Sequence, residues 1–127
     1  ARDKARDLLE LMQLTRLAEE PARVLSGGQR KLLELARVLM ADPALILLDE
    51  PAAGVNPSLL EVLIDRIREI NARGVTFLLI EHNIDMVTRL CGRLIVMANG
   101  ALLCEGPPEA VARDPRVIEA YLGGAAA

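Results

Sequence analysis

The sequence predicts an α/β fold built on a mostly parallel β-sheet. Two continuous apolar runs, residues 44–48 and 75–80, have the length and composition of strands that are buried on both faces. A helical segment between them can be capped by Asn56 and ended by Gly74. This order of strand, helix and strand predicts a βαβ unit with a right-handed crossover.

Two helices should precede the first strand. Apolar residues at positions 8, 9, 11, 12 and 14 line one side of the first helix. The second helix runs from Ser26 to about Ala41, where Asp42 and Pro43 end it. Its predicted buried stripe consists of Leu32, Leu33, Leu35, Ala36, Leu39 and Met40.

The second strand should be followed by a short helix and a β-hairpin. The helix covers residues 84–90, and the hairpin strands are residues 93–98 and 101–105. Asn99 and Gly100 between them are a strong signal for a two-residue turn. Two short helices then close the chain, the second of which begins at residues 114–115.

Composition narrows the function classes. The 127 residues include one Phe, one Tyr and no Trp, and the net charge is -3, so base stacking and phosphate attraction are both poorly supported. We therefore expect no nucleic-acid partner. The two cysteines, Cys91 and Cys104, are too few for a disulfide framework or a zinc cluster, which favours a reducing, cytosolic setting.

Two acids and the single histidine follow the two predicted strands. Asp49 and Glu50 come after the first strand, and His82 after the second. Because the carboxyl ends of parallel strands meet at one edge of the sheet, we expect His82 to lie near Glu50. Ligands of such sheets bind at this edge. Carboxylates at this edge can hold Mg²⁺ and orient an attacking water. The alternatives are a strand that ends in two solvated acids and a histidine with only a structural role.

The segment "LSGGQ" places two glycines in the first turn of the second helix. Ser26 can cap this helix, and Gly27 and Gly28 add no side chain to its tip. A helix N-terminus carries unpaired N–H groups and partial positive charge, so a phosphate could approach them closely. The alternative is a serine cap with glycines that serve only a bend.

The three features together resemble the ATP-binding subunits of ABC transporters. Residues 25–29, "LSGGQ", are similar to the signature motif of that family, and residues 45–50, "LILLDE", to its Walker B strand with the catalytic glutamate. "AGVN", residues 53–56, resembles the D-loop, and His82 the switch histidine. Segments such as "LLIEHNIDMV", "ALLCEGPPEAV" and "DPRVIEAYLG" are similar to branched-chain amino acid importers. In those importers Glu typically precedes the switch histidine, as Glu81 does here.

Some residues depart from the family pattern. Asn56 stands where the D-loop usually has Asp, Asn83 stands where Asp commonly follows the histidine, and Leu32 replaces a frequent Arg. A P-loop of the form GxxxxGK[ST] is also missing, because neither Lys4 nor Lys31 follows a glycine. We therefore expect the C-terminal half of a nucleotide-binding domain, inactive as an ATPase by itself.

The resemblance implies a partial P-loop NTPase core of the ABC type. Residues 1–41 would be the end of the helical subdomain with the signature motif, and residues 42–127 the C-terminal half of the ATPase core with its hairpin and helices. An exposed apolar surface left by the missing half predicts self-association. Two other interpretations stay open: the C-terminal ATPase lobe of a chromosome-maintenance or DNA-repair protein, and a non-enzymatic interaction fragment.

The resemblance also implies a mechanism. Two subunits would meet head to tail with ATP between them, on the cytoplasmic face of the cell membrane and against membrane-spanning permease subunits. Ser26, Gly27, Gly28 and Gln29 would bind the terminal phosphate of ATP held by the partner. Asp49 would hold Mg²⁺, Glu50 would activate the attacking water, and His82 would hold the same phosphate.

Overall fold

The structure, a computed structural model, describes residues 1–122, with the backbone alone for Leu122. It contains two compact units, Ala1–His82 and Asn83–Ala127, which are described separately. These units differ from the two parts that the sequence predicts, residues 1–41 and 42–127 of a nucleotide-binding domain. That assignment of parts stays a prediction. The final residue of the segment "DPRVIEAYLG" lies outside the described residues.

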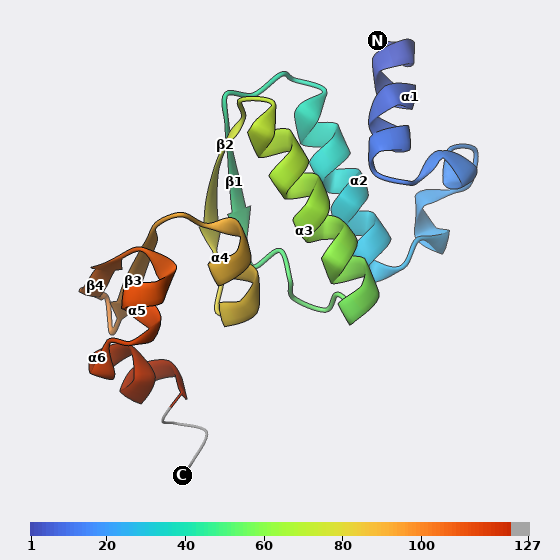
Figure 1. Cartoon of the computed structure of the whole chain (residues 1–127). Helices are drawn as coiled ribbons and strands as arrows, with labels where there is room; N and C mark the ends of the chain where they lie inside the picture. Colours follow the sequence, from blue (N-terminus) through green and yellow to red (C-terminus); the bar gives the residue numbers. More distant parts are fainter. Residues whose placement is uncertain (123–127) are drawn as a thin grey trace. The chain divides into compact units, whose positions relative to one another are not determined.

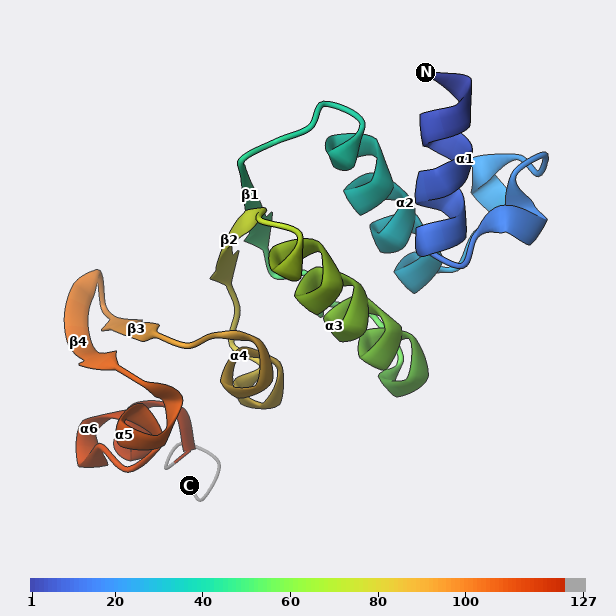
Figure 2. The same cartoon turned by 45° about the horizontal axis from the view of Figure 1, so that its top comes forward.

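The first unit has a parallel strand pair flanked by helices (Figure 1). Its elements in chain order are α1 (Arg2–Leu11), the 3-10 turns η1 (Thr15–Leu17) and η2 (Ala22–Val24), α2 (Gly27–Leu39), β1 (Leu45–Asp49), α3 (Pro57–Ala72) and β2 (Thr76–Ile80). The views in Figures 1 and 2 both place α2 and α3 side by side along the strand pair. The expected βαβ unit is thus present, with β1 and β2 parallel and paired from Leu45–Thr76 to Asp49–Ile80.

The helix between the strands begins and ends as its sequence indicates. The side chain of Asn56 accepts a hydrogen bond from the backbone N–H of Leu59 at 2.9 Å, so it caps α3. At the other end Gly74 has a φ of +102°. The N–H groups of Gly74 and Val75 donate to the carbonyls of Asn71 and Ile70, the pattern of a Schellman motif.

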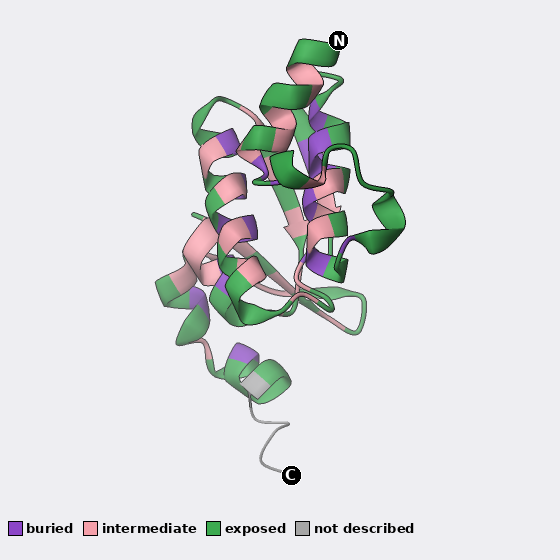
Figure 3. Cartoon of the chain, turned by 90° about the vertical axis from the view of Figure 1, so that its right-hand side faces the viewer, coloured by how far each residue is buried: buried purple, intermediate pink, exposed green. Residues whose placement is uncertain are grey.

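The core of the first unit lies between its helices and one face of the sheet. Figure 3 shows buried positions spread along the helices of the chain. Met40, predicted to be buried, is 36 % exposed, because α2 ends at Leu39 and the chain turns away there. The buried apolar side chains of this unit are Met12, Leu14, Leu25, Leu32, Leu35, Ala36, Leu39, Ile46, Leu63, Ile64, Ile67 and Ile70.

The strands are buried on one face only, which corrects the prediction of burial on both. Ile46 is 2 % exposed, whereas its neighbour Leu47 is 67 % exposed. Successive side chains of a strand point to opposite faces, and α2 and α3 cover only one of them. The open face carries four exposed apolar side chains, Leu45, Leu47, Leu78 and Ile80, which we call the open sheet face.

The second unit contains a short helix, a β-hairpin and further short helices in that order. Its elements are α4 (Ile84–Leu90), β3 (Leu94–Ala98), β4 (Ala101–Gly106), α5 (Pro108–Ala112), α6 (Pro115–Val117) and the π-helical segment η3 (Ile118–Leu122). The strands are antiparallel, and φ is positive at both Asn99 and Gly100, as a type I′ turn requires. None of the described helices combines the length and the apolar composition that a membrane span needs.

Candidate functional site

The two strand ends of the first unit bring a carboxylate and an imidazole together. Nδ1 of His82 lies 3.2 Å from Oε1 of Glu50, and both side chains are exposed to solvent. The backbone arrangement explains this pairing, because the N–H of Glu50 donates to the carbonyl of Ile80 at 2.7 Å and extends the parallel ladder by one residue. The expected proximity of His82 and Glu50 is therefore confirmed, whereas their catalytic roles stay predictions.

The backbone of Glu50 has an uncommon conformation that the sequence did not reveal. Its φ is +48°, in the left-handed region that costs a residue with a Cβ atom roughly 1 kcal/mol. The carbonyl of Glu50 accepts a hydrogen bond from Nζ of Lys31 at 3.0 Å and another from the N–H of Ala53 at 3.1 Å. Lys31 of α2 thus holds the backbone carbonyl of Glu50, whose conformation sets the direction of the Glu50 side chain.

The predicted magnesium ligand, Asp49, lies at the carboxyl end of β1 and is exposed. It borders a cavity of about 250 Å³ together with Lys31, Glu34, Leu35, Val38, Leu47, Leu48, Pro51 and Leu63. Within residues 1–122, no three His, Cys, Asp or Glu side chains are grouped closely enough to hold a metal by themselves. The residues still fit Mg²⁺, which commonly takes one or two carboxylates and completes its shell with phosphate oxygens and water.

A second carboxylate, from Glu81, is buried beneath this edge of the sheet. The side chain of Glu81 is 1 % exposed, although the neighbouring His82 ring is 70 % exposed. Its Oε2 accepts from the N–H of Ala52 at 3.0 Å, and its Oε1 accepts from the N–H of His82 at 3.1 Å. In the sequence, Glu81 indicates only similarity to the importer group. Its place directly after a strand, beside the histidine, was the available signal for a structural role.

The tip of α2 is closed by a capping box. Oγ of Ser26 accepts from the N–H of Gln29 at 3.2 Å, and Oε1 of Gln29 accepts from the N–H of Ser26 at 2.9 Å. The cap therefore uses Oε1 of Gln29, whereas the hydroxyl hydrogen of Ser26 and the NH₂ group of Gln29 can still donate. Ser26 and Gly27 are exposed, so an anion can reach them, but Gly28 is buried.

Gly27 and Gly28, at the N-terminus of α2, have different surroundings at the position of a missing Cβ atom. A Cβ atom on Gly28 would lie 2.0 Å from Cδ2 and 2.8 Å from Cγ of Leu59, so the first turn of α3 occupies that space. A Cβ atom on Gly27 would meet only the carbonyl oxygen of Gly54, at an ordinary 3.6 Å. Packing alone thus accounts for Gly28, and the proposed close approach of phosphate depends chiefly on Gly27. No pattern in the sequence indicates that Leu59 packs against Gly28.

Comparisons with known protein families match both ends of the chain. Residues 1–53 match the family described as ABC transporter. Residues 101–127 match the family described as branched-chain amino acid ATP-binding cassette transporter. These matches are to transporter proteins, which favours that interpretation over the chromosome-maintenance alternative.

Individual relatives and a solved structure agree with the family matches. The probable branched-chain amino acid transport ATP-binding protein LivG of Archaeoglobus fulgidus is 45 % identical over 121 residues, which cover 95 % of this chain and 47 % of LivG. The lipopolysaccharide export system ATP-binding protein LptB of Haemophilus influenzae is 36 % identical, with 96 % of this chain and 51 % of LptB covered. The crystal structure of the ADP conformation of MJ1267, an ATP-binding cassette of an ABC transporter, is 42 % identical with a TM-score of 0.86, and 95 % of this chain and 49 % of MJ1267 are covered.

The solved structure confirms the predicted fold class, a partial ATPase core of the ABC type. The assignment of residues 1–41 to the end of a helical subdomain stays a prediction. The chain spans about half the length of the curated relatives it matches, 47 % of LivG and 51 % of LptB. Over about half the length of such a protein, the chain is similar to the ATP-binding proteins of ABC transporters, among them those of branched-chain amino acid systems.

Proposed function

We propose that this chain forms the second half of an ATP-binding subunit that hydrolyses ATP to drive the import of branched-chain amino acids. The observation that carries the proposal is the contact between Glu50 and His82 at the carboxyl ends of adjacent parallel strands. A carboxylate and an imidazole at that edge suit the positioning of a water and of a terminal phosphate.

In the proposed mechanism Glu50 accepts a proton from the attacking water, and His82 donates a hydrogen bond to the terminal phosphate. Phosphoryl transfer depends mainly on positioning and on stabilising charge, so both groups must be aimed before the reaction starts. Mg²⁺, when bound, neutralises charge on the phosphate oxygens, and Asp49 is the residue that would hold it. The Glu50–His82 contact, the Lys31 hydrogen bond and the backbone hydrogen bonds of Glu50 supply the required rigidity.

The helix tip of α2 serves a different nucleotide in this proposal. Ser26 and Gly27 are exposed at the positive end of a helix that extends to Leu39, and they would contact the terminal phosphate of ATP held by a second subunit. Gly28 and Gln29 belong to the same binding turn, the first through its N–H and the second through the cap that fixes the turn. This arrangement requires a head-to-tail pair of subunits.

We further propose that the complete subunit docks on permease subunits at the inner, cytoplasmic face of the membrane. The match of the C-terminal residues to the branched-chain amino acid transporter family supports branched-chain amino acids as the transported solutes.

The 127-residue chain contains no P-loop sequence, so we expect negligible ATP turnover from the chain alone.

The test is a transport assay with the complete subunit and its permease in vesicles, energised with ATP. Wild-type protein should hydrolyse ATP and take up labelled leucine. The Glu50→Gln variant should bind ATP but lose hydrolysis by roughly 10²- to 10³-fold, together with uptake. Glu20→Gln, an exposed charge change in the loop after η1, is the matched control. Hydrolysis at the wild-type rate by Glu50→Gln would contradict the proposal, as would export of a lipid instead of leucine uptake.

A further inference from the structure

We propose that Glu81 is a positioning residue, whose buried carboxylate holds the loop after Glu50 and the peptide of His82 in one fixed relation. This inference rests on the proposed function, because it concerns how Glu50 and His82 are aimed. It assigns Glu81 no contact with nucleotide or water. The role follows from burial and from the two hydrogen bonds that this carboxylate accepts.

The carboxylate joins two segments that are distant in sequence. Ala52, whose N–H reaches Oε2, lies two residues after Glu50 and at the start of the loop that leads to α3. The N–H of His82, which reaches Oε1, belongs to the residue that contacts Glu50. Each carboxylate oxygen thus holds one of the two strand-end segments of the site.

The geometry requires two acceptor atoms at the end of the side chain, not merely a polar group. Both partners of Glu81 in this clamp are N–H donors, so both terminal atoms of the side chain must be acceptors. Glutamine has the same shape but only one acceptor, and its NH₂ group would face an N–H donor at about 3 Å. One buried N–H group would then be left without its acceptor, which is costly.

The loop needs this support because the backbone near it is strained. Glu50 has a φ of +48°, and such a conformation persists only where the surrounding contacts hold it. Lys31 holds the carbonyl of Glu50 from the side of α2, and Glu81 holds the N–H of Ala52 from the side of β2. Removing the Glu81 carboxylate releases one of these two restraints while the Glu50 side chain itself stays intact.

The experiment compares Glu81→Gln, Glu81→Asp and Glu50→Gln in the complete subunit, with Glu20→Gln as a charge-matched control. Because a small misplacement of catalytic groups can cost orders of magnitude, kcat for ATP should fall by about 10- to 100-fold in Glu81→Gln. The KM should change by no more than about twofold, because Glu81 makes no proposed contact with nucleotide. Glu81→Asp keeps both oxygens and should recover part of the rate. Hydrogen exchange at the Ala52 amide should be faster in Glu81→Gln.

The outcomes separate this inference from the proposed function. Turnover retained by Glu50→Gln contradicts the proposed function and this inference with it. Turnover lost in Glu50→Gln but kept within about twofold of wild type in Glu81→Gln contradicts this inference alone. If Glu81→Gln shows no cooperative thermal transition and is therefore not folded, the Glu81→Asp variant provides the test. A lowered kcat at unchanged KM in Glu81→Asp supports the positioning role. Wild-type kinetics in Glu81→Asp contradict it.

Discussion

Leu59 of α3 fills the space that a side chain on Gly28 of α2 would need, since a Cβ atom there would lie 2.0 Å from Cδ2 of Leu59. The signature helix and the helix after the D-loop segment are therefore in direct contact inside one subunit. Gly28 owes its missing side chain to this contact, whereas Gly27 has room for a Cβ atom beside Gly54. The two glycines should respond differently to the same substitution.

Gly28→Ala should destabilise the chain by about 1–3 kcal/mol, the usual cost of forcing an extra carbon into packed space. Gly27→Ala is the matched control, because alanine is the better helix former and should change stability by less than about 1 kcal/mol. Chemical denaturation of the 127-residue chain measures both. Shortening Leu59 to Ala should offset part of the Gly28→Ala cost, and strict additivity of the two changes would contradict this contact.

Lys31→Met should loosen the turn at Glu50. The Nζ of Lys31 donates to the Glu50 carbonyl at 3.0 Å, and loss of this charge-assisted bond from a half-buried side chain should cost about 1 kcal/mol. Faster amide hydrogen exchange at residues 50–53 would locate the effect. Arg37→Met, an exposed change on the same helix, should leave that exchange unaltered. Equal exchange in both variants would show that Lys31 does not support the turn.

The open sheet face should make the isolated chain self-associate. Its members include Leu47, 67 % exposed, and Ile80, 60 % exposed, on neighbouring strands. Contiguous exposed apolar surface of this kind favours association. In sedimentation velocity at micromolar concentration, the wild-type chain should form dimers or larger species, and the pair Leu47→Lys and Ile80→Lys should shift it toward monomer. Val24→Lys changes an exposed apolar residue elsewhere and should not. A monomeric wild-type chain would contradict this expectation.

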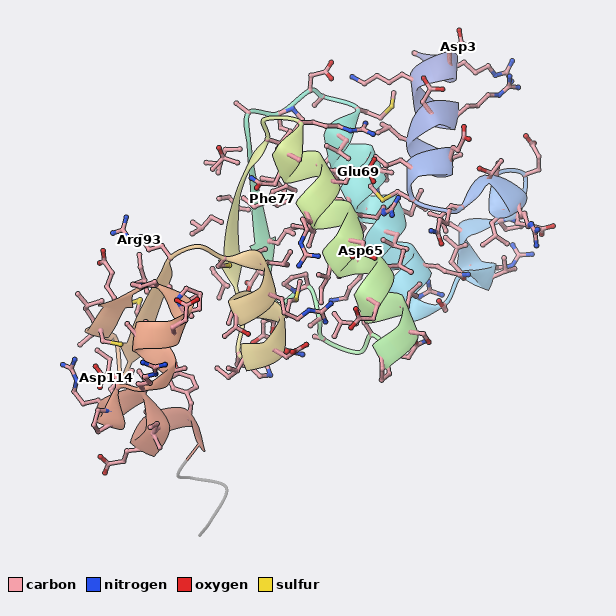
Figure 4. The ribbon with its side chains drawn as sticks, viewed as in Figure 1. Asp3, Asp65, Glu69, Phe77, Arg93 and Asp114 are labelled. Carbon is pink, nitrogen blue, oxygen red and sulfur yellow. The ribbon has the colours of Figure 1, made fainter. Side chains whose placement is uncertain are left out.

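Asp114, labelled in Figure 4, should stay ionised to unusually low pH. Side-chain and backbone hydrogen bonds from Arg116 lower the pKa of Asp114 from 3.8 to about 2. Because the folded-state pKa is depressed, the stabilising contribution is present above about pH 4 and is lost as the pH falls through about 2. A carboxyl titration by NMR measures this. Arg116→Gln should return the pKa toward 3.8, and a wild-type value already near 3.8 would refute the assignment.

The order and type of the elements could be predicted because each has a local cause. The Asn56 cap, the Gly74 terminus and the turn at Asn99 and Gly100 all depend on residues close in sequence. Burial was harder to predict, because it depends on which elements cover a surface. The apolar run of β1 gave no sign that Leu47 would be exposed while Ile46 is buried.

In the candidate site, too, features with a local cause could be predicted and features that depend on tertiary packing could not. Parallel strand ends meet at one edge, so the approach of His82 to Glu50 followed from strand order alone. The supporting contacts of Lys31 and Glu81 could not be predicted, because they join residues whose spacing depends on tertiary packing. The packing reason for Gly28 was missed for the same cause, since Leu59 lies on another helix.

The most direct test of the account is a structure of the complete Glu50→Gln subunit trapped with ATP and Mg²⁺. The account predicts a head-to-tail pair in which the N–H of Gly27 lies about 2.7–3.2 Å from a terminal phosphate oxygen of the nucleotide bound by the other subunit. Glu50 and His82 would face a nucleotide held at their own sheet edge. A trapped pair in which Ser26 and Gly27 contact no phosphate would contradict the account.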